Sequence, residues 1–210
     1  MTLSVHIQRL ATRQHTLVQN LRLTVASGQI LTLMGPSGCG KSTVLAAIAG
    51  TLDREALHFE GTVELDGRDL TPLPTARRGI GLLFQDDLLF AHMTVAENLL
   101  FAVPAGPKPA RLAAVQAALD EAGLSGFADR DPATLSGGQR ARVALMRALL
   151  AQPRALLLDE PFSRLDTALR AQFRSFVFEH VRSRRLPVVL VTHDRDDIAD
   201  PAHVVTLGHA

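Results

Sequence analysis

The sequence predicts an α/β protein with a helical insertion. Residues 1–65 are dominated by short runs that alternate between apolar and polar side chains or are wholly apolar, as strands are, while the middle of the chain shows helical patterns. Strand-like runs then return and alternate with a long helical pattern. An α/β core that carries an inserted group of helices would show this order of elements.

The N-terminal part is expected to consist mainly of strands. Residues 4–10 and 21–25 alternate between apolar and polar side chains, and residues 30–34 are almost continuously apolar, which favours burial in a parallel sheet. A glycine-rich turn then leads into a short helix over residues 41–50 that stops at a glycine. Another strand is expected over residues 61–67, between two glycines.

The middle of the chain is expected to be helical. Residues 88–103 are apolar with a helical spacing, and the proline-rich residues 104–109 form a stiff linker. An alanine-rich amphipathic helix is expected over residues 111–123, and a third helix starts with Ser136 as its N-cap. Beyond this helix, which ends near residue 151, we expect a helix over residues 167–185 and strands at residues 155–158, 187–192 and 204–207.

The composition excludes several classes of protein. Lysine and arginine total 22 and aspartate and glutamate total 21, so the formal net charge is 22 − 21 = +1, which argues against a general nucleic-acid binder. No run approaches the ~18 consecutive apolar residues of a membrane-spanning helix, and the first residues lack the pattern of a signal peptide. The single cysteine, Cys39, cannot form an internal disulfide. We therefore expect a chain that stays in the reducing cytosol.

A phosphate-binding loop is predicted between the apolar strand at residues 30–34 and the helix after it. Residues 35–42 match G-x-x-x-x-G-K-[ST], in which glycines let backbone N–H groups turn toward phosphate oxygens. Lys41 can reach the β- and γ-phosphates, and the Ser42 hydroxyl can bind Mg²⁺. The alternative is a glycine-rich turn with an incidental lysine. The flanking strand and helix favour a nucleoside triphosphate site formed by Gly35, Pro36, Ser37, Gly38, Cys39, Gly40, Lys41, Ser42 and Thr43.

Two further groups are typical of phosphate chemistry. Residues 135–139 join glycines and a hydroxyl to the start of a helix, like a second phosphate contact, although such a run alone indicates only a turn. Asp159 and Glu160 end an apolar strand, where the ligand crevice of a parallel sheet lies. Asp159 can then reach Mg²⁺, and Glu160 can orient or deprotonate the attacking water. A solvated turn is the alternative for an isolated pair of acids.

These residues, in this order, resemble those of the ATP-binding-cassette (ABC) ATPases from about residue 3 to the C-terminus. The matching segments are the Walker A loop at residues 35–43, the Q-loop at Gln85, the signature at residues 135–139, Walker B at residues 156–159, the catalytic Glu160, the D-loop at residues 163–166 and the switch His193. The resemblance implies a P-loop NTPase with a RecA-like core, an N-terminal antiparallel β-subdomain and an inserted α-helical subdomain. Within one domain, residues 1–85 and 152–210 would form the nucleotide-binding core and residues 86–151 the helical subdomain.

The resemblance also implies the roles of these residues, with ATP and Mg²⁺ as cofactors. Catalysis would depend on Glu160, His193 and Gln85, and Mg²⁺ would be bound by Ser42, Gln85 and Asp159. Two subunits would pack head to tail and enclose two ATP molecules, so that a twofold dimer makes both sites equivalent. The second subunit would then contact the nucleotide through Ser136, Gly137, Gly138, Gln139 and Asp166.

Within this family the chain is most similar to the ATP-binding subunits of binding-protein-dependent importers, the thiamine, sulfate, molybdate, iron and polyamine group. The similarity lies in residues 81–98. It implies a homodimer on two membrane permease subunits, a secreted solute-binding protein and a peripheral place on the cytoplasmic face of the bacterial inner membrane, with no nucleic acid as partner. Leu88, Leu89, Phe90 and Met93 would lie partly in the core and partly in the permease contact.

Three positions need separate interpretation. Thr12 stands where the family usually has an aromatic residue stacked on adenine, so stacking is weakened or is supplied by Arg13 or His15. Arg164 replaces a small residue that is common in the D-loop. Cys39 either fills space as a small residue or, lying beside a lysine and ahead of a helix, forms a reactive thiolate.

Two other functions share these motifs. An ABC exporter or a lipoprotein-release ATPase would transport in the opposite direction, and the neighbouring genes would distinguish it from an importer. A non-transport ABC ATPase is the second alternative. Repair proteins of that kind carry a long coiled coil between the Q-loop and the signature, and no sustained heptads occur between Gln85 and Leu135.

Overall fold

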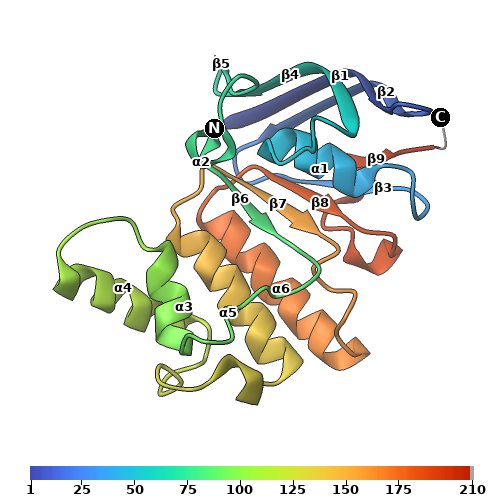
Figure 1. The fold of residues 1–210 in the computed structure, drawn as a ribbon. Coiled ribbons are helices and arrows are strands. Elements are labelled where there is room, and N and C mark those ends of the chain that lie inside the picture. Colours follow the sequence, from blue (N-terminus) through green and yellow to red (C-terminus); the bar gives the residue numbers. More distant parts are fainter. Residues whose placement is uncertain (209–210) are drawn as a thin grey trace. The chain divides into compact units, whose positions relative to one another are not determined.

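The computed structural model describes residues 1–208, whose contacts form two compact units. Unit 1 contains Met1–Leu82, Arg154–Glu160 and the chain from Phe178 on, and unit 2 contains Leu83–Pro153 and Pro161–Val177. Figure 1 labels the elements of both units. The subdomain boundaries expected from the sequence stay a prediction, and Pro161–Val177 groups with the helical middle of the chain.

Unit 1 begins with a four-stranded antiparallel sheet in the order β2-β1-β4-β5. Its strands are β1 (Thr2–Thr12), β2 (Thr16–Ala26), β4 (Leu57–Leu65) and β5 (Arg68–Asp69). The alternating side chains of β1 between Leu3 and Ile7 are buried, as the sequence pattern predicted. The strands are longer than predicted because backbone pairing continues through polar residues, such as Arg9 opposite Gln19.

A second sheet has five strands in the order β6-β7-β8-β3-β9. They are β3 (Ile30–Met34), β6 (Ile80–Leu83), β7 (Ala155–Asp159), β8 (Val188–Val191) and β9 (Val204–Thr206). β3, β7 and β8 are parallel and almost wholly buried, which explains their continuously apolar sequences. The sequence did not reveal β6, whose residues are mostly half-buried and include Gly81.

The carboxyl ends of three parallel strands meet at one edge of this sheet. β3 ends at Met34 directly before the phosphate loop, β7 ends at Asp159, and β8 ends at Val191 shortly before His193. β8 pairs with both β3 and β7, so these ends are neighbours. The topology therefore brings segments that are distant in the sequence to one place in unit 1.

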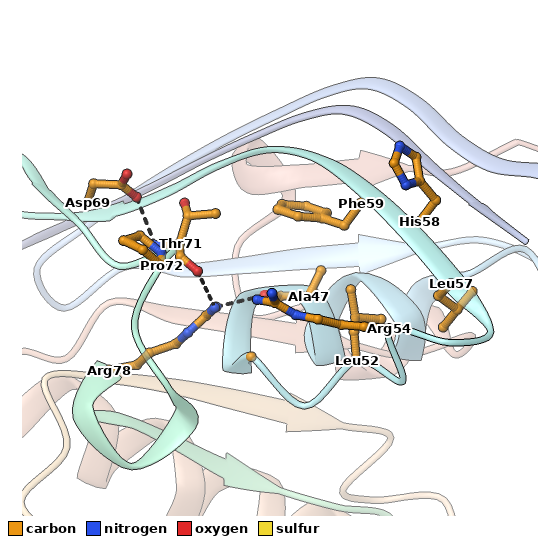
Figure 2. Close-up of a pocket in the computed structure, with 11 residues that line it drawn as sticks. Ala47, Leu52, Arg54, Leu57, His58, Phe59, Asp69, Thr71, Pro72 and Arg78 are labelled. Atoms are coloured by element: carbon orange, nitrogen blue, oxygen red, sulfur yellow. Dashed lines mark hydrogen bonds between the residues drawn. The ribbon is translucent and has the colours of Figure 1, made fainter.

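α1 (Lys41–Ala49) follows the phosphate loop and ends at Gly50, as predicted. Nη1 of the buried Arg78 donates to the carbonyl oxygens of Ala47 and Ile48 at 2.9 and 2.8 Å. Figure 2 shows this guanidinium among the side chains that line a pocket at the end of α1. The pocket has a volume of about 540 Å³. A Cβ at Gly50 would lie 2.5 Å from Arg78 Nε, so glycine is required there. A cation at the C-terminus stabilises the helix whose other end begins at the phosphate loop.

Unit 2 is helical. It contains α3 (Val95–Ala102), α4 (Lys108–Glu121), α5 (Gly137–Leu150) and the first part of α6 (Thr167–Ser183), which continues into unit 1. α3, α4 and α5 all contact one another. Ser136 is the N-cap of α5, as the sequence predicted. α4 begins within the expected linker at Lys108, since a proline in the first turn of a helix needs no N–H partner.

The helix expected over residues 88–103 is wrong in its first part, because α3 begins only at Val95. Thr94 caps this helix, and the buried Asn98 holds the preceding residues in a non-helical path. Asn98 Oδ1 accepts the N–H of Phe90 at 2.8 Å, and its Nδ2 donates to the carbonyl oxygen of Phe90 at 3.1 Å. Apolar spacing alone does not reveal such side-chain-to-backbone bonds.

The remaining short elements are α2 (Thr75–Arg78) and the 3₁₀ turns Pro132–Thr134, Arg195–Asp197 and Pro201–His203. Within residues 1–208, every helix is too short or too polar to span a membrane.

Candidate functional site

The phosphate loop joins β3 to α1, and its glycines determine its course. Gly38 and Gly40 have φ angles of 80° and 95°, a left-handed conformation that other residues rarely adopt. Gly40 is the N-cap of α1, and no side chain caps the helix there. A Cβ at Gly40 would lie 3.3 Å from Val18 of β2, so the loop has little room for a larger residue. The first N–H groups of α1 are therefore available to an anion.

Lys41 brings a positive charge to this loop. Its side chain is only 5 % exposed, and Nζ donates to the carbonyl oxygens of Gly35 and Pro36 at 2.8 and 2.9 Å. Both acceptors are uncharged. A phosphate oxygen would make a stronger, charge-assisted bond to the same ammonium. The loop and its lysine can therefore take up an anion, and that they do so stays a prediction.

Cys39 is a packing residue of the loop. Its side chain is 4 % exposed, and a Cβ at Gly35 would lie 2.7 Å from Cys39 Sγ. The thiol therefore fills the space beneath Gly35. The structure favours the interpretation as a small residue over the alternative of a reactive thiol, because a reagent has little access to Sγ.

Ser42 and Asp159 combine hydroxyl and carboxylate oxygens at the same edge. Ser42 Oγ donates to Asp159 Oδ1 at 3.0 Å. Burial raises the pKa of Asp159 and the charge of Glu160 adds to this effect, while the Ser42 hydrogen bond and the charge of Lys41 oppose it. Oxygen atoms of this kind are the ligands that Mg²⁺ prefers, so the two side chains fit this ion chemically.

Glu160 lies beside His193. Its φ angle is 46°, which is uncommon for a residue with a side chain, and its N–H donates to the carbonyl oxygen of Val191 at 3.0 Å. Glu160 Oε1 lies 3.2 Å from His193 Nδ1. The side chains are 22 % and 55 % exposed, so water reaches both. The pair can orient a water molecule or move a proton at the strand edge.

The loop that carries His193 is fixed by a buried hydrogen bond. Thr192 Oγ1 donates to Asp197 Oδ2 at 2.8 Å, and both side chains are buried. The N–H of Asp194 donates to Thr192 Oγ1 at 3.1 Å. Sequence reasoning missed this support. Its only signal was a threonine followed by three aspartates within five positions.

The predicted signature begins α5 in unit 2. Ser136 Oγ accepts the N–H of Gln139 at 3.3 Å, and Gln139 Oε1 accepts the N–H of Ser136 at 2.9 Å, which together form a capping box. A Cβ at Gly138 would lie 3.3 Å from Leu169 of α6, so the two helices approach closely there. The N–H groups of Gly137 and Gly138 belong to the first turn and have no acceptor within the helix.

The other predicted site residues of unit 2 are placed as follows. Gln85 is exposed in a bend that follows β6. Asp166 Oδ1 accepts the N–H of Leu169 at 3.0 Å, so this aspartate caps the start of α6. Unit 1 thus brings together Lys41, Ser42, Asp159, Glu160 and His193. That Gln85, Asp166 and residues 136–139 act on a bound nucleotide stays a prediction.

The turn that contains Thr12 precedes β2. Thr12 Oγ1 accepts the N–H groups of Gln14 and His15 at 3.2 and 3.0 Å, so the hydroxyl serves the turn itself. Arg13 Nη2 donates to the carbonyl oxygen of Glu55 over a long 3.5 Å. The exposed His15 offers the one ring in this turn.

Comparison with known proteins agrees with this geometry. Residues 18–163 match the family model described as ABC transporter. The chain is 55 % identical over 193 residues to the uncharacterized ABC transporter ATP-binding protein YnjD of Escherichia coli K12, which covers 91 % of this chain and 88 % of that protein. It is 43 % identical to the thiamine import ATP-binding protein ThiQ of Cereibacter sphaeroides, over 95 % of this chain and 85 % of that protein.

A third relative is longer. The chain is 42 % identical to the sulfate/thiosulfate import ATP-binding protein CysA of Mycobacterium tuberculosis, over 91 % of this chain but 54 % of that protein. The shared part therefore spans about half of CysA. The family match covers more than half of this chain and includes both the phosphate loop and the strand that ends at Asp159. The chain belongs to the ABC transporter family, as an ATP-binding subunit of a family that hydrolyses ATP.

Proposed function

We propose that the chain hydrolyses Mg·ATP to drive the import of a small solute through a membrane permease. The observation that carries this proposal is the arrangement in unit 1, where the buried Lys41 lies near the hydrogen-bonded Ser42 and Asp159 and the charge of Glu160 acts on the same aspartate. A protein that only bound nucleotide would need the loop and its lysine. It would have no need for a water-accessible carboxylate beside a histidine.

In this proposal Lys41 exchanges its two carbonyl acceptors for oxygens of the β- and γ-phosphates. The first N–H groups of α1 surround the same phosphates, and the partial positive charge of the helix N-terminus favours them. Because these groups are held by the fold before ATP arrives, little reorganisation is needed on binding.

Mg²⁺ would be held by Ser42 and Asp159, with Gln85 as a further ligand. The Ser42–Asp159 hydrogen bond holds the two oxygen ligands 3.0 Å apart. When bound, the ion neutralises phosphate charge. Burial raises the pKa of Asp159, and a bound cation would favour its ionised form again.

Glu160 would orient or deprotonate the attacking water, and His193 would contact the γ-phosphate. The backbone of Glu160 is anchored to β8, and the Thr192–Asp197 bond anchors the loop of His193. Both side chains are thus held on fixed backbone while their ends remain exposed to water. Hydrolysis then depends mainly on positioning and charge, as is general for phosphoryl transfer.

We infer a head-to-tail homodimer with two composite sites. One chain carries two helix N-termini suited to phosphate, at Gly40 and at Ser136. In a twofold dimer, Ser136, Gly137, Gly138, Gln139 and Asp166 of one subunit would complete the nucleotide site of the other.

Exposed apolar side chains on unit 2 support docking to a permease. Phe84, Leu88 and Phe101 are 44 %, 54 % and 65 % exposed, and the ring of Phe101 packs edge-on against Phe90 at 5.0 Å. Leu88 is thus exposed, whereas the remaining residues of the predicted patch, Leu89, Phe90 and Met93, are half-buried. Such a patch is typical of a protein contact. The homodimer would then lie on two permease subunits at the cytoplasmic face of the bacterial inner membrane.

Import is favoured over export by the named relatives, since ThiQ and CysA are both described as import ATP-binding proteins. The system would then include a secreted solute-binding protein. The solute would contact that protein and the permease rather than this chain.

Two experiments test this function. Purified chain carrying Glu160→Gln should double its mass in light scattering when ATP is added, because ATP is bound and not consumed. Lys41→Ala should stay a monomer under the same conditions. A Glu160→Gln variant that saturates with ATP and stays a monomer would contradict the dimer.

Import is tested by purifying the tagged chain from membranes of its native cell. We expect a permease with several membrane spans to copurify, and Phe101→Asp to abolish its recovery while leaving ATP binding intact. If the genes beside that of the permease include none for a secreted binding protein, this would contradict import and favour the exporter alternative.

A further inference from the structure

The segment directly after Gln85 is held by charged side chains. Asp86 forms an ion pair with Arg164, and Asp87 Oδ2 lies 3.3 Å from Arg140 Nε. These two adjacent carboxylates, here called the aspartate pair, thus have one arginine each. All of these residues belong to unit 2.

A third arginine fixes the backbone of the same segment. Arg147 Nη2 donates to the carbonyl oxygen of Asp87 at 3.1 Å, and Nη1 donates to that of Leu88 at 2.9 Å. Burial lowers the pKa of Arg147 and raises that of Asp87, whose side chain is 29 % exposed. The segment is therefore held through its main chain as well as its carboxylates.

The two arginines that pair with the aspartates are Arg140 and Arg164. They lie at, or just before, the starts of two helices that have predicted roles at the nucleotide. Arg140 follows Gln139 in the first turn of α5, and Arg164 lies two positions before Asp166, the cap of α6. Arg140 Nη1 also donates to the carbonyl oxygen of Leu135 at 2.6 Å, so it joins the turn before the signature to Asp87. The aspartate pair thus connects the start of α5 with the segment that leads into α6.

We propose that the aspartate pair makes Gln85, the signature turn and the segment of Asp166 move as one body, with Arg164 as a positioning residue for hydrolysis. This inference rests on the proposed function. Each connected segment is predicted to act on a nucleotide, and the bonds between the segments join arginine side chains to carboxylates and to main-chain carbonyl oxygens. The pair therefore acts by setting the relative positions of three segments that hydrolysis requires at the same moment.

The Asp86–Arg164 ion pair suits positioning better than it suits stabilising the fold. The two side chains are about half to two-thirds exposed. Exposed ion pairs contribute little to stability and are screened by salt. Their loss should therefore leave folding intact and appear in the rate of hydrolysis.

The test compares ATP hydrolysis by purified wild-type chain, Arg164→Ala, Arg164→Lys and the charge exchange Asp86→Arg with Arg164→Asp. Arg164→Ala should lower kcat about threefold to tenfold, with KM for ATP and the melting temperature nearly unchanged. Arg164→Lys should restore most of the rate. The kcat of the charge exchange should exceed the kcat of either of its single variants. The difference between wild type and Arg164→Ala should shrink in about 1 M salt.

Arg68→Ala is the matched control, because Arg68 is an exposed arginine of β5 with no side-chain partner in the described residues. It should retain the wild-type rate. An unchanged kcat in Arg164→Ala, or a charge exchange no faster than its slower single variant, would overturn the inference while the proposed function stands. A wild-type chain that hydrolyses no Mg·ATP would instead overturn the proposed function.

Discussion

The two helix starts that are predicted to face phosphate, those of α1 and α5, are built differently. α1 begins at Gly40 without any side-chain cap, and the buried Lys41 follows at once. α5 begins at Ser136 with a complete capping box, in which Ser136 and Gln139 satisfy each other's N–H groups. At the start of α1, the backbone N–H groups and the charge of Lys41 are available to a ligand. At the start of α5, side chains of the chain itself already accept part of the backbone N–H groups.

This difference indicates different tasks. An uncapped helix start with a buried ammonium can bind an anion without help. The start of α5 has no such charge to offer, because its nearby Arg140 is bonded to Asp87 and to the carbonyl oxygen of Leu135. We therefore expect the α1 start to determine affinity for nucleotide and the α5 start to affect hydrolysis alone.

The largest effect should come from removing the charge at the α1 start. Lys41→Ala should weaken ATP binding about a hundredfold or more, since hydrogen bonds to charged groups contribute roughly 1.5–3 kcal/mol each. Titration of the purified chain with a fluorescent ATP analogue measures this directly. Lys108→Ala, which changes an exposed lysine of α4, is the matched control and should bind normally. If Lys41→Ala lowered the affinity for ATP by less than tenfold, this would contradict the proposed difference between the two helix starts.

Glu160→Gln separates binding from hydrolysis within unit 1. The amide cannot accept the proton of the attacking water, so phosphate release should fall by at least about 10². The dissociation constant for ATP should stay close to that of the wild type. Unchanged phosphate release by the assembled transporter would exclude Glu160 from the reaction.

The α5 start can be examined with two variants of matched shape. Aspartate and asparagine both cap helices about as well as serine, so Ser136→Asp and Ser136→Asn should fold alike. Only the aspartate places a negative charge where the nucleotide of a second subunit is expected. Ser136→Asp should therefore hydrolyse ATP at least about tenfold more slowly than Ser136→Asn, as charge repulsion of this kind costs at least 1.4 kcal/mol. Equal rates would mean that no phosphate approaches α5.

The smallest effect concerns the base of the nucleotide. Neither helix start recognises a base, and the Thr12 hydroxyl is occupied within its own turn. GTP should therefore compete with ATP within about tenfold, a difference of roughly 1.4 kcal/mol. Competition binding measures the ratio. A preference for ATP above about a hundredfold would show that Arg13, His15 or another group recognises adenine.

The sequence predicted the parts of the site that depend on short-range spacing. The loop from Gly35 to Lys41, the cap at Ser136 and the strand that ends at Asp159 each lie within a few consecutive residues. The Glu160–His193 contact could be anticipated from strand ends alone, because neighbouring parallel strands bring their carboxyl ends to one edge.

The parts that the sequence did not reveal depend on tertiary contacts. The Asp86–Arg164 ion pair joins residues far apart in the chain, and many other arginines in the sequence look equally suitable. The helical segment expected over residues 88–94 is absent because the buried Asn98 bonds to the backbone there. Apolar periodicity records which face is buried, and it carries no information on such bonds.

We infer that the α5 start of one subunit acts on the nucleotide held at the α1 start of another. Mixing two impaired variants, Lys41→Ala and Ser136→Asp, tests this inference. In a mixed dimer, one site would combine an intact Lys41 with an intact Ser136. The mixture is assayed in the assembled transporter, because the permease would hold two subunits together even where Lys41→Ala does not dimerise by itself. About half of randomly assembled pairs are mixed and each has one intact site, so ATP hydrolysis should recover to as much as about a quarter of the wild-type rate. A mixture no faster than the average of its two components would contradict the claim.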